Sequence, residues 1–281
     1  MNIWSQPQAN SLFTLVDGQR VHYRRAGDGP VVLLLHGSGS SLQGFERVAD
    51  LLSHSFTVIS PDLPGFGLTG PRKDRDYRIE TYVSTVGRFM QALQVPEYTL
   101  VGNSLGGNIA WNMALEYPER LTALVLVNAT GYPGKSLPTG MRLARNPLLR
   151  PLLRVWLPRR ATERNLKSAV GPKSTIVDSA MVDRVYGLMS LPGNRSAFID
   201  LANTDQADRS AEICRISVPT LVLRSEGIDA QYFARDIGGS REQVHADGGH
   251  LLPEEDPGWV AGAVEAFLRS LKDQTQQGDA Q

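Results

Sequence analysis

Cysteine is nearly absent from this 281-residue sequence, in which Cys214 is the only one. A chain with one cysteine forms no internal disulfide, and a zinc site built from several thiolates is excluded. Cys214 stands just before an expected strand, and free cysteine is among the most often buried residue types. We therefore expect Cys214 to be a small packed residue of the interior.

The sequence also lacks an excess of charge of either sign and any long apolar run. It has 29 Lys and Arg against 29 Asp and Glu, which argues against the electrostatic footprint of a nucleic-acid-binding protein. No apolar run reaches the roughly 18 residues of a membrane span, and Met1 to Asn10 show no secretory pattern. We expect a cytoplasmic protein with no nucleic-acid partner.

Short apolar runs alternate with helical patterns along most of the chain. After a hairpin turning at Asp17-Gly18, strands are expected at Val31–Leu35, Thr57–Ser60, Thr99–Val101, Leu124–Val127 and Thr220–Leu223. Runs that are apolar on both faces are typical of parallel strands covered by helices. The intervening helices are expected at Phe45–Leu52, Ile79–Leu93, Leu105–Glu116 and Trp259–Leu271. This pattern predicts an α/β fold with a mostly parallel, doubly wound sheet.

The segment 131–210 interrupts the alternation because it contains no convincing strand. We expect residues 1–130 and 211–281 to form the core and residues 131–210 to form a helical cap. Leu148, Leu149, Leu152, Leu153 and Trp156 recur at helical spacing within a basic stretch. Two interpretations follow: leucines that cover a pocket with arginines in water, or a surface that contacts anionic lipid or acidic substrates. The polar tail after Lys272 is expected to fray.

The strongest motif is Gly102-Asn103-Ser104-Leu105-Gly106-Gly107, between an expected strand and an expected helix. A sharp turn in this context lifts a serine oxygen clear of the sheet, and a Cβ at either flanking glycine would collide across it. The free N–H groups and positive dipole end of the helix then lie beside a developing anion. Ser104 is therefore the candidate nucleophile.

Two further motifs supply partners for such a serine. His36-Gly37-Ser38-Gly39 follows the first parallel strand, and we expect the N–H groups of Ser38 and Leu105 to form an oxyanion hole. His36 is expected to hold this loop in shape. Asp247-Gly248-Gly249-His250 lies in a glycine-rich loop after the last expected strand, where a general base is needed, so His250 is the candidate base.

These motifs resemble the α/β-hydrolase superfamily from about Phe13 to Leu271. Asp62-Leu63-Pro64-Gly65-Phe66-Gly67 is similar to the family's loop after its second parallel strand, and Tyr117-Pro118-Glu119-Arg120 to the turn after its nucleophile helix. The resemblance implies a Ser-acid-His triad in that chain order, a substrate pocket under the helical cap, and neither cofactor nor metal.

The chain departs from the family at the acid. Members usually place a Gly-x-x-Asp turn after the strand that corresponds to Thr220–Leu223, and the gapless equivalent of that aspartate is Ile228. Asp229, one position later, is the candidate acid, with Glu226 as the alternative and a carboxylate from elsewhere left open.

The expected function is that of a carboxylesterase-like serine hydrolase acting on a small-molecule ester with an apolar acyl group. Serine C–C bond hydrolases of ring-fission products carry a similar nucleophile motif, so they stay an alternative. A non-catalytic ligand-binding homologue is a third possibility, supported only by the irregular acid loop. The sequence does not specify the acyl chain length or the oligomeric state.

Overall fold

The computed structural model describes residues 3–136 and 139–278, and its centre is an eight-stranded sheet. The strand order is β1-β2-β4-β3-β5-β6-β7-β8, with β2 antiparallel to both β1 and β4 and every other pair parallel. The strands are β1 Leu12–Val16, β2 Gln19–Ala26, β3 Val31–Leu35, β4 Thr57–Pro61, β5 Tyr98–Asn103, β6 Leu121–Val127, β7 Thr220–Ser225 and β8 Arg241–His245. The predicted α/β class and the N-terminal hairpin are confirmed.

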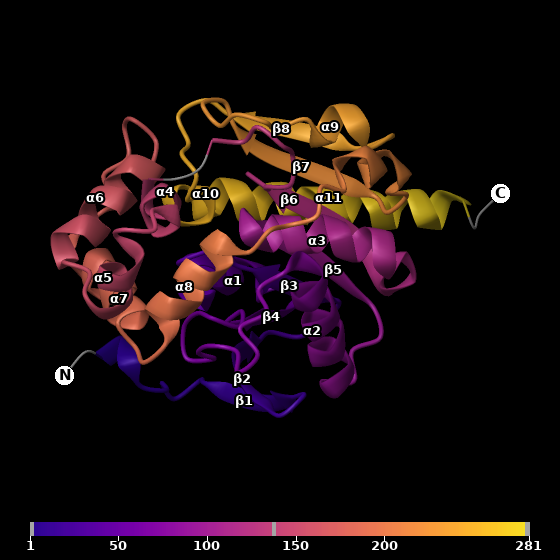
Figure 1. Cartoon of the computed structure of the whole chain (residues 1–281). Coiled ribbons are helices and arrows are strands. Elements are labelled where there is room, and N and C mark those ends of the chain that lie inside the picture. The colour runs from indigo at the N-terminus through magenta and orange to yellow at the C-terminus, as the bar shows by residue number, and fades with distance from the viewer. Residues whose placement is uncertain (1–2, 137–138, 279–281) are drawn as a thin grey trace.

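Helices cover both faces of the sheet because the central strands are apolar on both sides (Figure 1). Leu33 and Leu35 of β3 belong to one core cluster, while the alternate residues Val32 and Leu34 belong to the other. The first cluster contains residues of α2 and α3, and the second contains residues of α1 and α11. The helices of these layers are α1 Glu46–Leu52, α2 Ile79–Ala92, α3 Leu105–Glu116 and α11 Pro257–Gly278, with short helices α9 Phe233–Asp236 and α10 Leu252–Glu255 near β7 and β8.

Between β6 and β7 the described residues form helices and no strand, as the sequence predicts. These inserted helices are α4 Thr139–Arg145, α5 Arg150–Val155, α6 Arg159–Ala169, α7 Ser179–Met189 and α8 Asn194–Asn203. They gather on one side of the molecule, at the left of Figure 1. That they act as a cap over a substrate pocket stays a prediction.

Short 3₁₀ helices complete the described elements, at η1 Ile3–Ser5, η2 Leu42–Phe45, η3 Pro118–Arg120 and η4 Ser210–Arg215. Cys214 lies on η4 and is exposed, so the expectation that it is packed is wrong. Its neighbour Ile213 takes the buried position of this turn instead. The tail predicted to fray after Lys272 continues α11 as far as Gly278, where the described residues end.

One buried carboxylate fixes the loops that follow β3 and β4. Asp62 accepts hydrogen bonds from the backbone N–H groups of Leu42 at 2.8 Å and Leu68 at 2.7 Å. Its Oδ2 also lies 2.7 Å from Nδ1 of the buried His22 on β2. Because a buried charge needs such partners, the Asp62-to-Gly67 motif is tied to both neighbouring loops. None of the described helices combines the length and the apolar character needed to cross a membrane.

Candidate active site

Ser104 stands at a sharp turn between β5 and α3. Its backbone has φ 55° and ψ −113°, a conformation that a residue with a side chain rarely adopts. The turn closes tightly, because a Cβ built on Gly102 would lie 2.2 Å from the carbonyl oxygen of Gly106. A Cβ on Gly106 would lie 2.1 Å from the carbonyl oxygen of Leu35. The prediction that a Cβ at either of these two glycines would collide across the turn is confirmed.

His250 lies in the loop between β8 and α10, and its side chain reaches Ser104. The Nε2 atom of His250 and the Oγ atom of Ser104 are 2.7 Å apart. A serine that donates its proton to Nε2 requires the imidazole to be neutral, with its own proton on Nδ1. The pair therefore has the distance and the orientation of a nucleophile and its general base.

The histidine loop is held by side chains at the ends of three strands. The Nδ2 of Asn103 donates to the carbonyl of His250 at 3.2 Å, and that of Asn128 donates to the carbonyl of Gly249 at 2.9 Å. The hydroxyl of Ser225 donates to the same Gly249 carbonyl at 2.8 Å. Asn103 belongs to the nucleophile motif, but sequence reasoning missed the positioning role of all three residues.

The inserted helices also contact this loop. The backbone N–H of His250 donates to the carbonyl of Ala169, the last residue of α6, at 2.7 Å. The carboxylate of Glu255 accepts from the N–H groups of Gly171 at 2.7 Å and Gly249 at 3.0 Å. The position of His250 thus depends on the end of α6 as well as on the sheet.

The loop after β3 lies against the nucleophile as the oxyanion hypothesis requires. A Cβ on Gly37 would lie 3.1 Å from the Cβ of Ser104, so a glycine here lets the loop approach the nucleophile closely. Leu105 is the first residue of α3, and its N–H therefore has no acceptor within the helix. The N–H of Ser38 makes no hydrogen bond with any described residue. The oxyanion role of both N–H groups stays a prediction.

His36 is buried and bridges two backbone segments. Its Nδ1 donates to the carbonyl of Gly37 at 2.8 Å, and its Nε2 accepts from the N–H of Leu63 at 2.9 Å. Burial lowers the pKa of His36, which favours the neutral ring that this bonding pattern needs. Both ring nitrogens are used in holding the loop, in agreement with the role expected for this residue.

Asp229 lies near His250, yet its carboxylate binds another partner. Oδ2 accepts hydrogen bonds from the N–H of Ser136 at 2.9 Å and from the Ser136 hydroxyl, which lower the pKa of Asp229. Among the described residues, no carboxylate forms a hydrogen bond with Nδ1 of His250. Glu226, the alternative, is exposed. The role of Asp229 as the acid therefore stays a prediction.

The surroundings of the imidazole favour its neutral form. The pKa of His250 is lowered to about 4, chiefly by burial and also by the positive charge of Lys135, while the negative charge of Asp229 opposes both effects. Burial also lowers the pKa of Lys135 to about 8. The Nζ of this lysine donates to the carbonyl of Asp229 at 3.2 Å. Lys135 is a further site residue that sequence reasoning missed, since the sequence shows it only as one of many basic residues.

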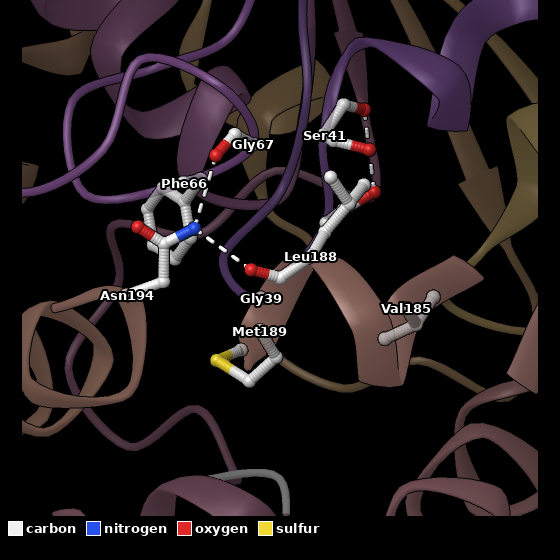
Figure 2. Close-up of a pocket in the computed structure, with 9 residues that line it drawn as sticks. Gly39, Ser41, Phe66, Gly67, Val185, Leu188, Met189 and Asn194 are labelled. Atoms are coloured by element: carbon white, nitrogen blue, oxygen red, sulfur yellow. Dashed lines mark hydrogen bonds between the residues drawn. The ribbon is translucent and has the colours of Figure 1, made fainter. Parts of the chain in front are cut away.

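A pocket adjoins the oxyanion loop on the side of the inserted helices (Figure 2). It lies between that loop, the loop after β4 and α7, and its lining includes Gly39, Ser41, Phe66, Val185, Leu188 and Met189. Asn194 closes one side, where its Nδ2 donates to the carbonyls of Gly67 and Leu188 at 3.0 and 2.8 Å. Besides the Asn194 amide and the hydroxyls of Ser40 and Ser41, the side chains that line the pocket are apolar.

Comparison with known proteins agrees with this geometry. A family model described as the alpha/beta hydrolase fold matches residues 30–257, which include all nine motif glycines and both candidate catalytic residues, Ser104 and His250. The chain belongs to the α/β-hydrolase family. It is accordingly a hydrolase built on this fold, as the sequence motifs predict.

Two curated members of the α/β-hydrolase family match most of the chain. An uncharacterized hydrolase of Bacillus subtilis is 28% identical over 90% of this chain and 96% of its own length. A 2-hydroxy-6-oxononadienedioate/2-hydroxy-6-oxononatrienedioate hydrolase of Burkholderia vietnamiensis is 32% identical over 78% of this chain and 77% of its own. Among solved structures, a thermophilic esterase from Thermogutta terrifontis superposes with a TM-score of 0.75 at 24% identity, covering 93% and 99% of the two chains.

The tight turn around Ser104 predicts that two glycine-to-alanine substitutions change the stability of the protein in opposite directions. Gly106→Ala forces a methyl group against backbone atoms, and we expect it to lower the free energy of unfolding by about 2 kcal/mol or more. The matched control is Gly262→Ala in α11, where a Cβ meets nothing within 4 Å, and we expect a gain of about 0.5–1 kcal/mol. Urea denaturation measures both, and equal effects of the two changes would contradict the steric account.

The low pKa of His250 predicts serine reactivity in mildly acidic solution. Labelling of Ser104 by a fluorophosphonate requires the neutral imidazole, so its rate should fall only as the pH drops through about 4. Lys135→Met removes a positive charge that lowers the pKa of His250, and the midpoint should move to higher pH. The control is Lys167→Met, which removes a lysine paired with Glu163 on α6. A midpoint that Lys135→Met leaves unchanged would show that this charge does not reach His250.

Proposed function

We propose that this α/β-hydrolase cleaves a small carboxylic ester through an acyl-enzyme intermediate. The observation that carries the proposal is the 2.7 Å contact between Ser104 Oγ and His250 Nε2 at a strained turn. Such a turn lifts the hydroxyl clear of the sheet at the carboxyl ends of its strands, beside the first N–H groups of α3. No metal or cofactor takes part in the proposed reaction.

In the first half of the reaction, Ser104 Oγ attacks the ester carbonyl and its proton passes to Nε2 of His250. The carbonyl oxygen becomes an oxyanion that accepts hydrogen bonds from the N–H groups of Ser38 and Leu105. When the tetrahedral intermediate collapses, the bond to the alkoxy oxygen breaks and His250 protonates the leaving alcohol. In the second half, a water molecule gives a proton to His250 and attacks the acyl-enzyme, which releases the carboxylic acid and restores Ser104.

The pocket beside the oxyanion loop supports a short, apolar acyl group. Its cavity volume is about 10 Å³, close to the space that one water molecule needs, so the lining admits only a small group unless it moves. Phe66, Leu188 and Met189 offer apolar contact, while Gly39 joins the pocket to the loop that carries Ser38. Esters of short acids should therefore be better substrates than esters of long fatty acids.

The relative from Burkholderia vietnamiensis favours a second candidate, hydrolysis of a C–C bond in a ring-fission keto-acid. Lys135 supports this candidate because a cation beside His250 suits a substrate that carries a carboxylate. Turnover of such a keto-acid without turnover of short acyl esters would select it. A chain that neither turns over substrate nor takes a fluorophosphonate label on Ser104 would instead be a non-catalytic binding protein.

A panel of p-nitrophenyl esters of increasing acyl length tests the proposed function. We expect the highest kcat/KM with the shortest acids, and a loss on the order of 10⁴-fold or more in Ser104→Ala, which removes the nucleophile. Met189→Ala enlarges the pocket and should shift the preference to longer chains while leaving Ser104 in place. A Ser104→Ala enzyme that keeps more than about a tenth of the activity would place the nucleophile elsewhere.

The acid is tested by comparing two substitutions in the loop after β7. Asp229→Asn removes a negative charge that favours the imidazolium, so we expect kcat to fall by roughly 10²-fold with little change in KM. Glu226→Gln, the matched change on the same loop, should cost less than about tenfold. Reversed effects would make Glu226 the acid, and two small effects would mean that another residue completes the triad.

A further inference from the structure

The helices α4 and α5 expose an unusual number of large apolar side chains. Six of the eleven large hydrophobic side chains that the described residues leave exposed lie between positions 143 and 156, namely Leu143, Leu148, Leu149, Leu152, Val155 and Trp156. Leu148 and Val155 are 88% and 76% exposed, and Trp156 is 58% exposed. We call these six residues the apolar face. The interpretation in which the leucines cover a pocket is wrong for Leu148 and Leu152, which face outward.

The opposite side of the same helices is firmly attached to α8. Ala144 is buried against Ile199 and Ala202, and Leu153 packs on this small cluster. The Nε of Arg145 donates to the carbonyl of Ala202 at 2.7 Å. α4 and α5 therefore pack on α8 with their inner side. The apolar face is their outer side, which α8 does not cover.

The chain segment that carries the apolar face is strongly basic. The stretch 135–173 contains ten Lys and Arg residues and a single acid, Glu163, which gives it a net charge of +9. Because the whole chain carries +0, the rest of the sequence carries −9. Arg142, Arg150, Arg160 and Arg164 form no ion pair within the described parts of the chain. This part of the molecule concentrates apolar surface and unpaired positive charge.

We propose that the apolar face docks on an anionic lipid bilayer. Apolar side chains that enter the interface lose contact with water, and arginines beside them attract the phosphates of anionic lipids. Trp156 suits the interface in particular, since an indole combines a large apolar ring with one polar N–H group. A second copy of the chain docked through the same face would bring two sets of unpaired arginines together, which disfavours dimerisation here.

The docking surface is separate from the candidate active site, so binding is measured without any substrate. The probe is co-sedimentation with vesicles of phosphatidylcholine alone, or of phosphatidylcholine and phosphatidylglycerol at about 2:1, in low and high salt. We expect binding to the anionic vesicles at low salt, with at least a tenfold weaker affinity for neutral vesicles. High salt should weaken the binding too, because the Debye length falls from about 30 Å at 0.01 M to about 3 Å at 1 M.

Two groups of variants separate the apolar contribution from the charge. Leu148→Ser with Val155→Ser, and separately Arg150→Gln with Arg160→Gln, should each weaken binding at least tenfold. Their matched controls are Leu15→Ser on β1, which removes a leucine that is 69% exposed, and Arg25→Gln on β2, which removes an exposed arginine. We expect the controls to bind within about twofold of the unchanged protein. Unchanged thermal unfolding and esterase rates confirm that each variant is folded.

Several outcomes would overturn the proposal. Absence of binding to anionic vesicles at low salt would do so, as would equal binding to neutral vesicles or an equal loss in the controls. Retention on immobilised polyglutamate without vesicle binding would indicate an acidic protein partner instead. Self-association that is abolished by Leu148→Ser with Val155→Ser would indicate a second copy of the chain.

Discussion

The backbone conformation of Ser104 is the constraint on which the candidate site depends. A residue at φ 55° and ψ −113° costs on the order of 1–3 kcal/mol, and it persists only where its surroundings leave no alternative. Here the Ser104 N–H donates to the carbonyl of Val127 at 3.1 Å, and its carbonyl accepts from Thr130 at 3.2 Å. The turn is thus held by β6 as well as by the glycines around it. These contacts place the hydroxyl where the oxyanion loop and His250 converge.

The base reaches this point from 146 residues further along the chain, so its position requires its own support. Asn103, Asn128 and Ser225 end three neighbouring strands, and each donates to a carbonyl of the histidine loop. Parallel strands bring their carboxyl ends to one edge of the sheet, which is why residues so distant in sequence meet there. The sheet therefore supplies both the nucleophile and the frame that orients its base.

The strands, the main helices and the pair of Ser104 and His250 were predictable because each leaves a local signal. Periodicity marks the elements, and glycines mark the tight turn. The positioning role of Asn128 and the proximity of Lys135 to His250 depend on contacts across more than a hundred residues, which no local pattern records. The predictions that Cys214 and Leu148 are buried were wrong for the same reason. Both side chains are exposed because other side chains fill the interior. The sequence leaves the acid open between Asp229, Glu226 and a carboxylate from elsewhere because this loop departs from the family register by one residue.

The two sides of the inserted helices make different contacts. On the inner side, Ala169 accepts the His250 N–H, and the buried Arg184 of α7 forms an ion pair with Glu254 of α10. On the outer side, α5 presents apolar and basic side chains to the solvent. Since α5 and α6 are separated only by residues 156–158, a force on the outer face acts close to the element that fixes the base. The proposed docking surface and the support of His250 thus lie on opposite sides of the same insertion and use different residues.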